Sequence, residues 1–259
     1  MAVIPRRRRR RERSGDMSLV EHLGELRKRL VISALAIVGG SLAGWFLYWP
    51  VFRLLTNPFC DFMRSHPQFA RDPKDPCDLA IFSITEAFVL RLKLTLFLGL
   101  LIALPVVLYQ LWAFITPGLT ERERKFSLPF VFISVLLFAL GGWFAFFTLP
   151  RGLNFLLGFA GDQRIEVVLS IGKYVGFVML IVLAFGASFE FPIVLISLTM
   201  VGVLTSRQLR DWRRYVLLVI AVFAAVITPS ADPFTMIAMM IPLLIFYELA
   251  ILFSRIMKR

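Results

Sequence analysis

Two short segments of the sequence place carboxylates among basic residues. The first, SLVEHLGELRKRL (18–30), carries Glu25, and the second, TERERK (120–125), carries Glu123. A guanidinium group binds a carboxylate through two parallel hydrogen bonds, and the pair is stronger where the local dielectric constant is low. Because acids recur in both segments, we expect Glu25 and Glu123 to share a basic ligand. The alternative is a solvated helix face on which Glu25 pairs with Arg29, one turn further along.

A third carboxylate, that of Glu190, lies deep within an apolar run, in the segment SFEFP. An ionised side chain at the centre of a bilayer costs at least ~2.5–3.5 kcal/mol on insertion scales, so such residues face a cavity or a partner rather than lipid. We therefore expect Glu190 to meet a polar group, either from another subunit or from elsewhere in this chain.

Catalytic and metal chemistry find little support in the sequence. The chain has two histidines and two cysteines and no C-x-x-C pair, so a metal site is not expected. An intramembrane protease would need its histidine within an apolar run, but His22 and His66 both lie outside these runs. No G-x-x-x-x-G-K-[ST] loop is present, which argues against direct use of nucleotides. We predict a protein that is not an enzyme and holds no cofactor.

Apolar composition defines the elements that must position these residues. Hydrophobic residues make up 58% of the chain, against about 45–50% in average proteins, and several runs approach the ~20 residues that cross a bilayer. We predict an all-α, polytopic membrane protein with six transmembrane helices. The expected spans are about 30–49, 92–113, 128–149, 172–201, 215–228 and 235–254.

The distribution of charge predicts the direction of these spans. Cytoplasmic segments of membrane proteins are enriched in Lys and Arg. The N-terminal segment and the segments on its side of the membrane hold 20 Lys and Arg, whereas the segments on the opposite side hold six. Both termini are therefore expected in the cytoplasm. The net charge of +12 is clustered at the ends of apolar runs, so binding of nucleic acid is not expected.

The limits of the membrane domain follow from the same pattern. Residues 1–16, which include the run RRRRRRER, are expected to form a disordered basic tail that contacts anionic lipid, ahead of a membrane domain over residues 17–259. The fifth span, 215–228, would be only ~21 Å long. Either its ends are set too tightly, or thinner lipid or packing on other subunits accommodates it.

The two cysteines, Cys60 and Cys77, fall in the same outer loop, in an oxidising compartment. A bridge between them would close a short loop and could contribute ~3 kcal/mol in the chain-entropy model. Two free thiols are equally compatible with the sequence.

Five stretches follow one another along the chain in a specific order. They are HLGELRKRL (22–30), TEAFVLRLKLTLF (85–97), LPVVLYQLWAFITPGLTERERK (104–125), FGASFEFPIVL (185–195) and TPSADPFTMIAMMIPLLIFYE (228–248). Together they resemble the TatC family, the C subunit of the twin-arginine protein translocase. Any one stretch could arise by chance, whereas all five in order make the resemblance specific, and it covers most of residues 17–255.

The resemblance implies a function and a set of site residues. The family is the receptor for signal peptides with two adjacent arginines, and it helps to move folded proteins out of the cytoplasm, driven by the proton-motive force. Its motifs assign Glu25 and Glu123 to the twin arginines. They give Arg27 a positioning role and link Phe114 to recognition of the signal.

The resemblance also implies partners. Glu190 would face the concave side of the molecule and meet polar side chains of single-span subunits of the TatA and TatB type. Pro58 would fix a bend in the outer loop, and Asp232 would cap the sixth helix or shape the outer surface. A homo-oligomeric receptor complex in the bacterial inner membrane is expected. The alternative function is an ion- or proton-coupled secondary transporter, for which the sequence lacks the usual internal repeat.

Overall fold

The computed structural model describes residues 19–66, 77, 79–115, 127–158, 168–200, 202–228 and 232–256. Within these residues the regular elements are nine helices, with no strand beyond one isolated bridge. They are α1 (Leu19–Phe46), α2 (Tyr48–Ser65), α3 (Glu86–Ile115), α5 (Ser127–Gly158), α6 (Ile171–Phe189), α7 (Phe191–Met200), α8 (Ser206–Asp211), α9 (Arg213–Ile227) and α10 (Pro233–Ile256). This architecture confirms the predicted all-α fold.

Most of these helices have the length and composition of membrane spans. Five segments of the described chain qualify, namely His22–Phe46, Glu86–Phe114, Leu128–Gly158, Ile171–Met200 and Pro233–Ile256. The remaining expected span, the fifth along the chain, corresponds to α9, which has 15 residues and is therefore about 22 Å long. That is shorter than a bilayer core of about 30 Å, in line with the short fifth run of the sequence. The molecule is a multi-pass membrane protein.

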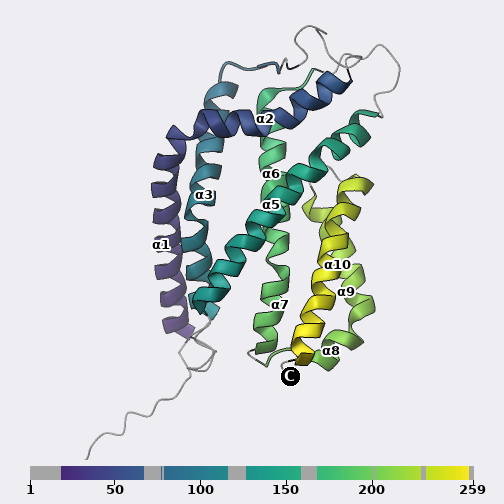
Figure 1. Cartoon of the computed structure of the whole chain (residues 1–259). Coiled ribbons are helices and arrows are strands. Elements are labelled where there is room, and N and C mark those ends of the chain that lie inside the picture. The colour runs from purple at the N-terminus through teal and green to yellow at the C-terminus, as the bar shows by residue number, and fades with distance from the viewer. Residues whose placement is uncertain are drawn as a thin grey trace, which may run out of the picture.

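The long helices run up and down through the molecule (Figure 1). α1 and α3 lie side by side at one edge, α6 continues into α7 near the centre, and α9 and α10 form the opposite edge. The start of α1 and the end of α10 lie at the same end of the bundle, which we call the terminal end. α2 lies across the other end, which we call the distal end.

The contact between α1 and α3 depends on glycine. A Cβ added to Gly40 on α1 would lie 2.6 Å from the carbonyl oxygen of Gly99 on α3. Small residues of this kind let two membrane helices approach until their backbones touch, where dispersion forces act over many atoms. This contact sets how the terminal ends of α1 and α3 face each other, and with them the residues of the candidate site.

The segment expected to be an outer loop contains α2. Its residues Leu55, Phe59, Phe62 and Met63 are buried, as one face of an amphipathic helix that lies on the bundle. Pro58 lies inside this helix, so the expectation that it bends a loop is wrong. Burial of the apolar face outweighs the backbone hydrogen bond that a proline removes from a helix.

Several covalent and polar contacts tie the distal end together. Cys60 of α2 is disulfide-bonded to Cys77, with 4.7 Å between their Cα atoms. The carboxylate of Glu86, at the start of α3, accepts hydrogen bonds from the backbone N–H of Gly172 at 2.9 Å and from the hydroxyl of Ser170. These contacts join α2, α3 and α6 to the segments between them.

The fourth expected span is built from two helices that meet at Glu190. Glu190 caps the C-terminus of α6, and its backbone N–H donates to the carbonyl oxygen of Ala187 at 3.2 Å. Pro192, on the first turn of α7, has no N–H with which to continue the ladder of α6. The break therefore falls at the residue whose side chain is the intramembrane acid.

Asp232 begins the last helix. Its carboxylate accepts hydrogen bonds from the backbone N–H of Thr235 at 2.8 Å and from the Thr235 hydroxyl at 2.5 Å. Asp232 is 4% exposed, so the cap is internal to the fold rather than part of an outer surface. The geometry is that of an N-cap residue bonding to the third helical position.

Candidate functional site

The candidate site lies at the terminal end, where the first turns of α1 meet the last turns of α3. Glu25 and Arg29 are one turn apart on α1 and form an ion pair. Arg29 also donates from Nη1 to the backbone carbonyl oxygen of Gln110 on α3, at 3.3 Å. Arg29 therefore neutralises Glu25 and joins the two helices at the same time.

The polar atoms of this ion pair are incompletely satisfied. The side chains of Glu25 and Arg29 are 24% and 18% exposed. Glu25 Oε2 and Arg29 Nε are buried without a hydrogen-bond partner among the described residues. A buried polar atom in this condition costs about 1–3 kcal/mol. Glu25 thus keeps one carboxylate oxygen, a strong acceptor, for a donor from outside the described residues.

An aromatic contact completes the site. The imidazole of His22 stacks on the ring of Phe114, with 4.5 Å between centroids and 27° between planes. His22 lies three residues before Glu25 on α1, and Phe114 lies in the last turn of α3. The stack therefore places an aromatic ring from the second helix close to the carboxylate of the first. The sequence did not indicate any role for His22 in this site.

Arg27, expected to position the site, does not contact Glu25. It is exposed and forms no ion pair within the described residues. Two residues of an α-helix are separated by about 200° around its axis, so Arg27 and Glu25 lie on opposite sides of α1. Arg29 instead supplies the partner, which the sequence indicated as the alternative interpretation of Glu25.

Glu123, the other expected carboxylate, lies outside the described residues. Its segment connects the end of α3 at Ile115 with the start of α5 at Ser127. The described part of the site therefore consists of His22, Glu25 and Arg29 on α1, and of Phe114 and the Gln110 carbonyl on α3.

Glu190 lies in a second polar cluster, further from the terminal end. Its carboxyl group is hydrogen-bonded to the hydroxyl of Ser134 on α5. That hydroxyl accepts a hydrogen bond from Trp112 Nε1 on α3 at 3.1 Å, and Ser134 is fully buried. The other carboxyl oxygen of Glu190, Oε1, is buried without a partner within the described part of the chain. Glu190 is thus paired in part inside this chain, as one of the two expectations had it.

The chemistry of the terminal site is that of cation recognition. A carboxylate with a free oxygen accepts two hydrogen bonds from a guanidinium group, and an aromatic ring nearby favours the same planar cation. No group of three or more His, Cys, Asp and Glu residues that could hold a metal occurs among the described residues. The arrangement can bind and orient a basic ligand.

Comparison with protein families relates the whole chain to one group. A family model described as Sec-independent protein translocase protein (TatC) matches residues 21–242. The Sec-independent protein translocase protein TatC of Frankia casuarinae is 42% identical over 257 residues, which are 97% of this chain and 69% of that protein. The protein of the same name from Aquifex aeolicus is 40% identical over 245 residues, covering 94% and 97% of the two chains.

A solved structure agrees with these sequence matches. The crystal structure of a twin-arginine translocase receptor, TatC, superposes with a TM-score of 0.74 at 39% identity, covering 92% of this chain and 100% of that one. At this identity and coverage, the likeness extends over most of the chain rather than to a shared helical bundle alone.

Proposed function

The chain belongs to the TatC family of Sec-independent protein translocase proteins, and on this premise we propose that its terminal end binds the twin-arginine signal peptides of proteins to be exported. The observation that carries the proposal is the half-buried carboxylate of Glu25, of which one oxygen has no hydrogen-bond partner among the described residues. A guanidinium group from the peptide would satisfy this oxygen and compete with Arg29 for the other.

Two adjacent arginines need two acceptors. We assign one acceptor to Glu25 and the other to Glu123, which lies on the segment that follows the end of α3 at Ile115. Phe114, whose one face is covered by His22, would offer its ring to the same peptide. Arg27, exposed on the far side of α1, would not contact the peptide directly. It would contribute positive charge to the surface around the site.

The site must face the compartment in which the cargo is made. We therefore place the terminal end in the cytoplasm and the distal end outside the bacterial inner membrane. The excess of Lys and Arg at the terminal end, 20 against six, supports this direction. The disulfide between Cys60 and Cys77 at the distal end also suits an oxidising compartment.

A receptor of this size needs other subunits to move a folded protein. We propose that Glu190 meets polar side chains of single-span partner subunits, because its Oε1 atom is buried without a hydrogen-bond partner in the described chain. Several copies of this chain would assemble with those subunits into the receptor complex, and the proton-motive force would drive the transport step.

Crosslinking of a twin-arginine signal peptide to the purified, membrane-embedded protein tests the assignment. Glu25→Ala and Glu123→Ala should each weaken crosslinking, and a peptide with two lysines should bind less well, because an ammonium group cannot make the bidentate contact. Glu248→Ala is a matched control, since Glu248 also pairs with an arginine, the exposed Arg213, outside the site. The proposal fails if both site variants crosslink as well as the unchanged protein.

A further inference from the structure

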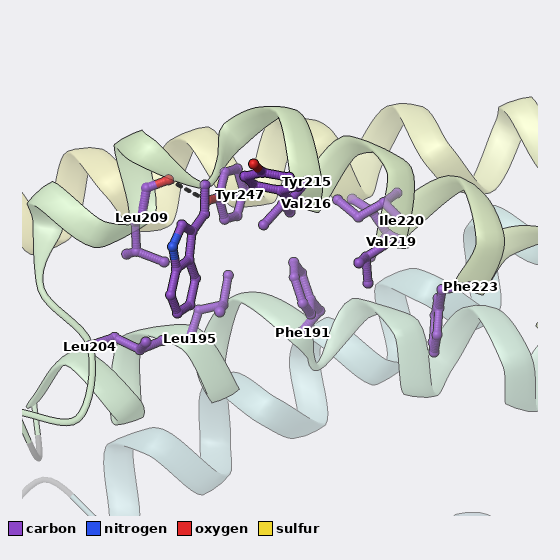
Figure 2. A pocket seen from close by; sticks show the side chains of 12 residues that line it. Phe191, Leu195, Leu204, Leu209, Tyr215, Val216, Val219, Ile220, Phe223 and Tyr247 are labelled. Carbon is purple, nitrogen blue, oxygen red and sulfur yellow. Dashed lines mark hydrogen bonds between the residues drawn. The ribbon is translucent and has the colours of Figure 1, made fainter.

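An apolar slot opens between α7 and α9, with α10 behind it (Figure 2). Its volume is about 450 Å³. Phe191 and Leu195 of α7 line one wall, and Val216, Val219 and Phe223 of α9 line the other, as Figure 2 shows. Neither Glu190 nor any residue of the terminal site lines the slot, so neither assignment above uses it.

The slot exists because α9 packs against the rest of the bundle with only a small part of its surface. Within α9, only Ile220 and Ala224 are buried. Val219 and Phe223, both slot residues, are 63% and 41% exposed. Exposed residues on the wall mean that the slot is open to whatever surrounds the helix. For a helix of a membrane protein, those surroundings are lipid or the helix of another subunit.

The chemistry of the slot wall selects an apolar ligand. No charged residue lines the slot. Its most deeply buried hydroxyl, that of Tyr247, already donates to the backbone carbonyl oxygen of Leu209 at 2.5 Å. The wall is therefore made of aliphatic and aromatic side chains and offers a ligand little hydrogen bonding inside.

The size of the slot distinguishes a hydrocarbon chain from a helix. The volume of about 450 Å³ lies within the roughly 300–1,000 Å³ of sites that hold small ligands. A helix with side chains is about 10 Å across, so even two of its turns occupy ~850 Å³. A single acyl chain fits a slot of this volume, whereas a partner helix could only lie over its mouth.

Four arginines of α8 and α9 lie close in the sequence to residues that line the slot, namely Leu209, Trp212 and Tyr215. Arg213 is paired with Glu248 at 2.5 Å, whereas Arg207, Arg210 and Arg214 form no ion pair within the described residues. Even with the carboxylate of Asp211 beside them, this corner of α8 and α9 keeps an excess of positive charge.

Arg214 connects the charged corner to the slot itself. Its Nη2 atom donates to the hydroxyl oxygen of Tyr215 at 3.0 Å, and its guanidinium carbon lies 4.9 Å from the centre of that ring. Tyr215 and Trp212 both line the slot and are about half exposed. Aromatic residues of this kind mark the level of lipid headgroups. A lipid with its tail in the slot would carry its phosphate to these arginines.

We propose that the slot between α7 and α9 holds an acyl chain of an anionic phospholipid, whose phosphate is bound by Arg210 and Arg214. The basic corner selects the headgroup and the apolar walls hold the tail, as in other basic sites between membrane helices. The bound lipid fills the space beside α9, which is too short to cover this flank of the bundle by itself.

Photolabelling tests the proposal on the full chain in nanodiscs of phosphatidylcholine with a minor share of phosphatidylglycerol that carries a photoactivatable acyl chain. Peptides from α7 and α9 should take most of the label. Val216→Trp, which fills the slot, should reduce this labelling several-fold. Leu218→Trp should not, because Leu218 lies on the same helix, is 63% exposed and does not line the slot.

Headgroup selection needs a second pair of variants. Arg210→Gln and Arg214→Gln should each lower the preference for phosphatidylglycerol over an equally photoactivatable phosphatidylcholine by about fivefold. Arg53→Gln, an exposed arginine on α2 at the distal end, should leave the preference unchanged. Normal crosslinking of the twin-arginine peptide shows that the variants are folded and separates this proposal from the receptor function.

Three results would overturn the proposal. The label could be spread over all lipid-facing helices in proportion to their exposure. The Val216→Trp and Leu218→Trp variants could take up the same amount of label. Phosphatidylcholine could label the slot as well as phosphatidylglycerol, in which case the arginine corner does not select the lipid.

Discussion

Arg29 holds the carboxylate of Glu25 before any ligand is present. The pair is partly buried, so its contribution to stability should lie between the ~0.2–1 kcal/mol of exposed pairs and the ~3–5 kcal/mol lost when a buried pair is broken. We expect Arg29→Gln to lower the free energy of unfolding by about 1–2 kcal/mol. Arg27→Gln, the matched change on the opposite side of α1, should have little effect. Thermal unfolding of the purified protein in detergent measures both.

Binding of the peptide should change how the melting temperatures of these variants differ. A twin-arginine peptide brings a new guanidinium group to Glu25, so it should raise the melting temperature of Arg29→Gln more than that of the unchanged protein. A two-lysine peptide should not do so, for want of the bidentate contact. Equal melting temperatures for Arg29→Gln and Arg27→Gln, with and without peptide, would contradict the assigned role of the pair.

Spacing along one helix was enough to predict part of this site. The acids among bases at 18–30 drew attention to Glu25, and the interval of four residues pointed to Arg29 as a possible partner. The stack of His22 on Phe114 could not be predicted, because it depends on how closely α1 approaches α3. The motif placed Arg27 in the site, but the helical repeat turns that side chain away from Glu25.

At the scale of helices, the approach of α1 to α3 is the contact that builds the terminal site. A Cβ on Gly40 would lie 2.6 Å from the Gly99 carbonyl oxygen, whereas a Cβ on the neighbouring Gly39 would meet nothing within 4 Å. We therefore expect Gly40→Ala to separate the two helices, lower the melting temperature and weaken peptide crosslinking.

The adjacent glycine provides the control for this change. Gly39→Ala should be neutral or slightly stabilising, because alanine favours a helix over glycine by up to about 1 kcal/mol. Melting temperatures and crosslinking yields of the two variants, compared under the same conditions, decide the matter. Similar behaviour of the two alanines would mean that the backbone contact does not position Glu25 and Phe114.

Long apolar runs predicted the spanning helices reliably. The sequence was a poorer guide to the helix between two runs and to the break within one run. Five of the expected runs correspond to segments that can span a bilayer, because composition alone suffices there. The helix α2 was missed, since Pro58 and a mixed polar sequence hide the buried face that only packing reveals. The break between α6 and α7 was likewise hidden, although Pro192 directly after the acid-bearing segment was a visible cue.

At the scale of the whole molecule, the two edges of the bundle differ in how well they are closed. The α1–α3 edge is sealed by backbone contact between glycines. The α9–α10 edge carries a helix of 15 residues and an open apolar slot. A bilayer core of about 30 Å exceeds the ~22 Å of α9, so lipid or other subunits must adapt to this flank. The proposed ligand site and the proposed lipid site thus lie at opposite edges of one bundle.

The direction of the bundle in the membrane can be tested with two reporter cysteines. Ile84, at the distal end, is 100% exposed, and Val203, between α7 and α8 at the terminal end, is 60% exposed. Each is replaced by Cys in a background of Cys60→Ser and Cys77→Ser, which removes the native cysteines. If the terminal end faces the cytoplasm, a membrane-impermeant maleimide should label Ile84→Cys in intact spheroplasts. Val203→Cys should react only after the membrane is permeabilised. The reverse pattern would place the carboxylate of Glu25 on the outer side, where a receptor for newly made proteins could not meet its ligand.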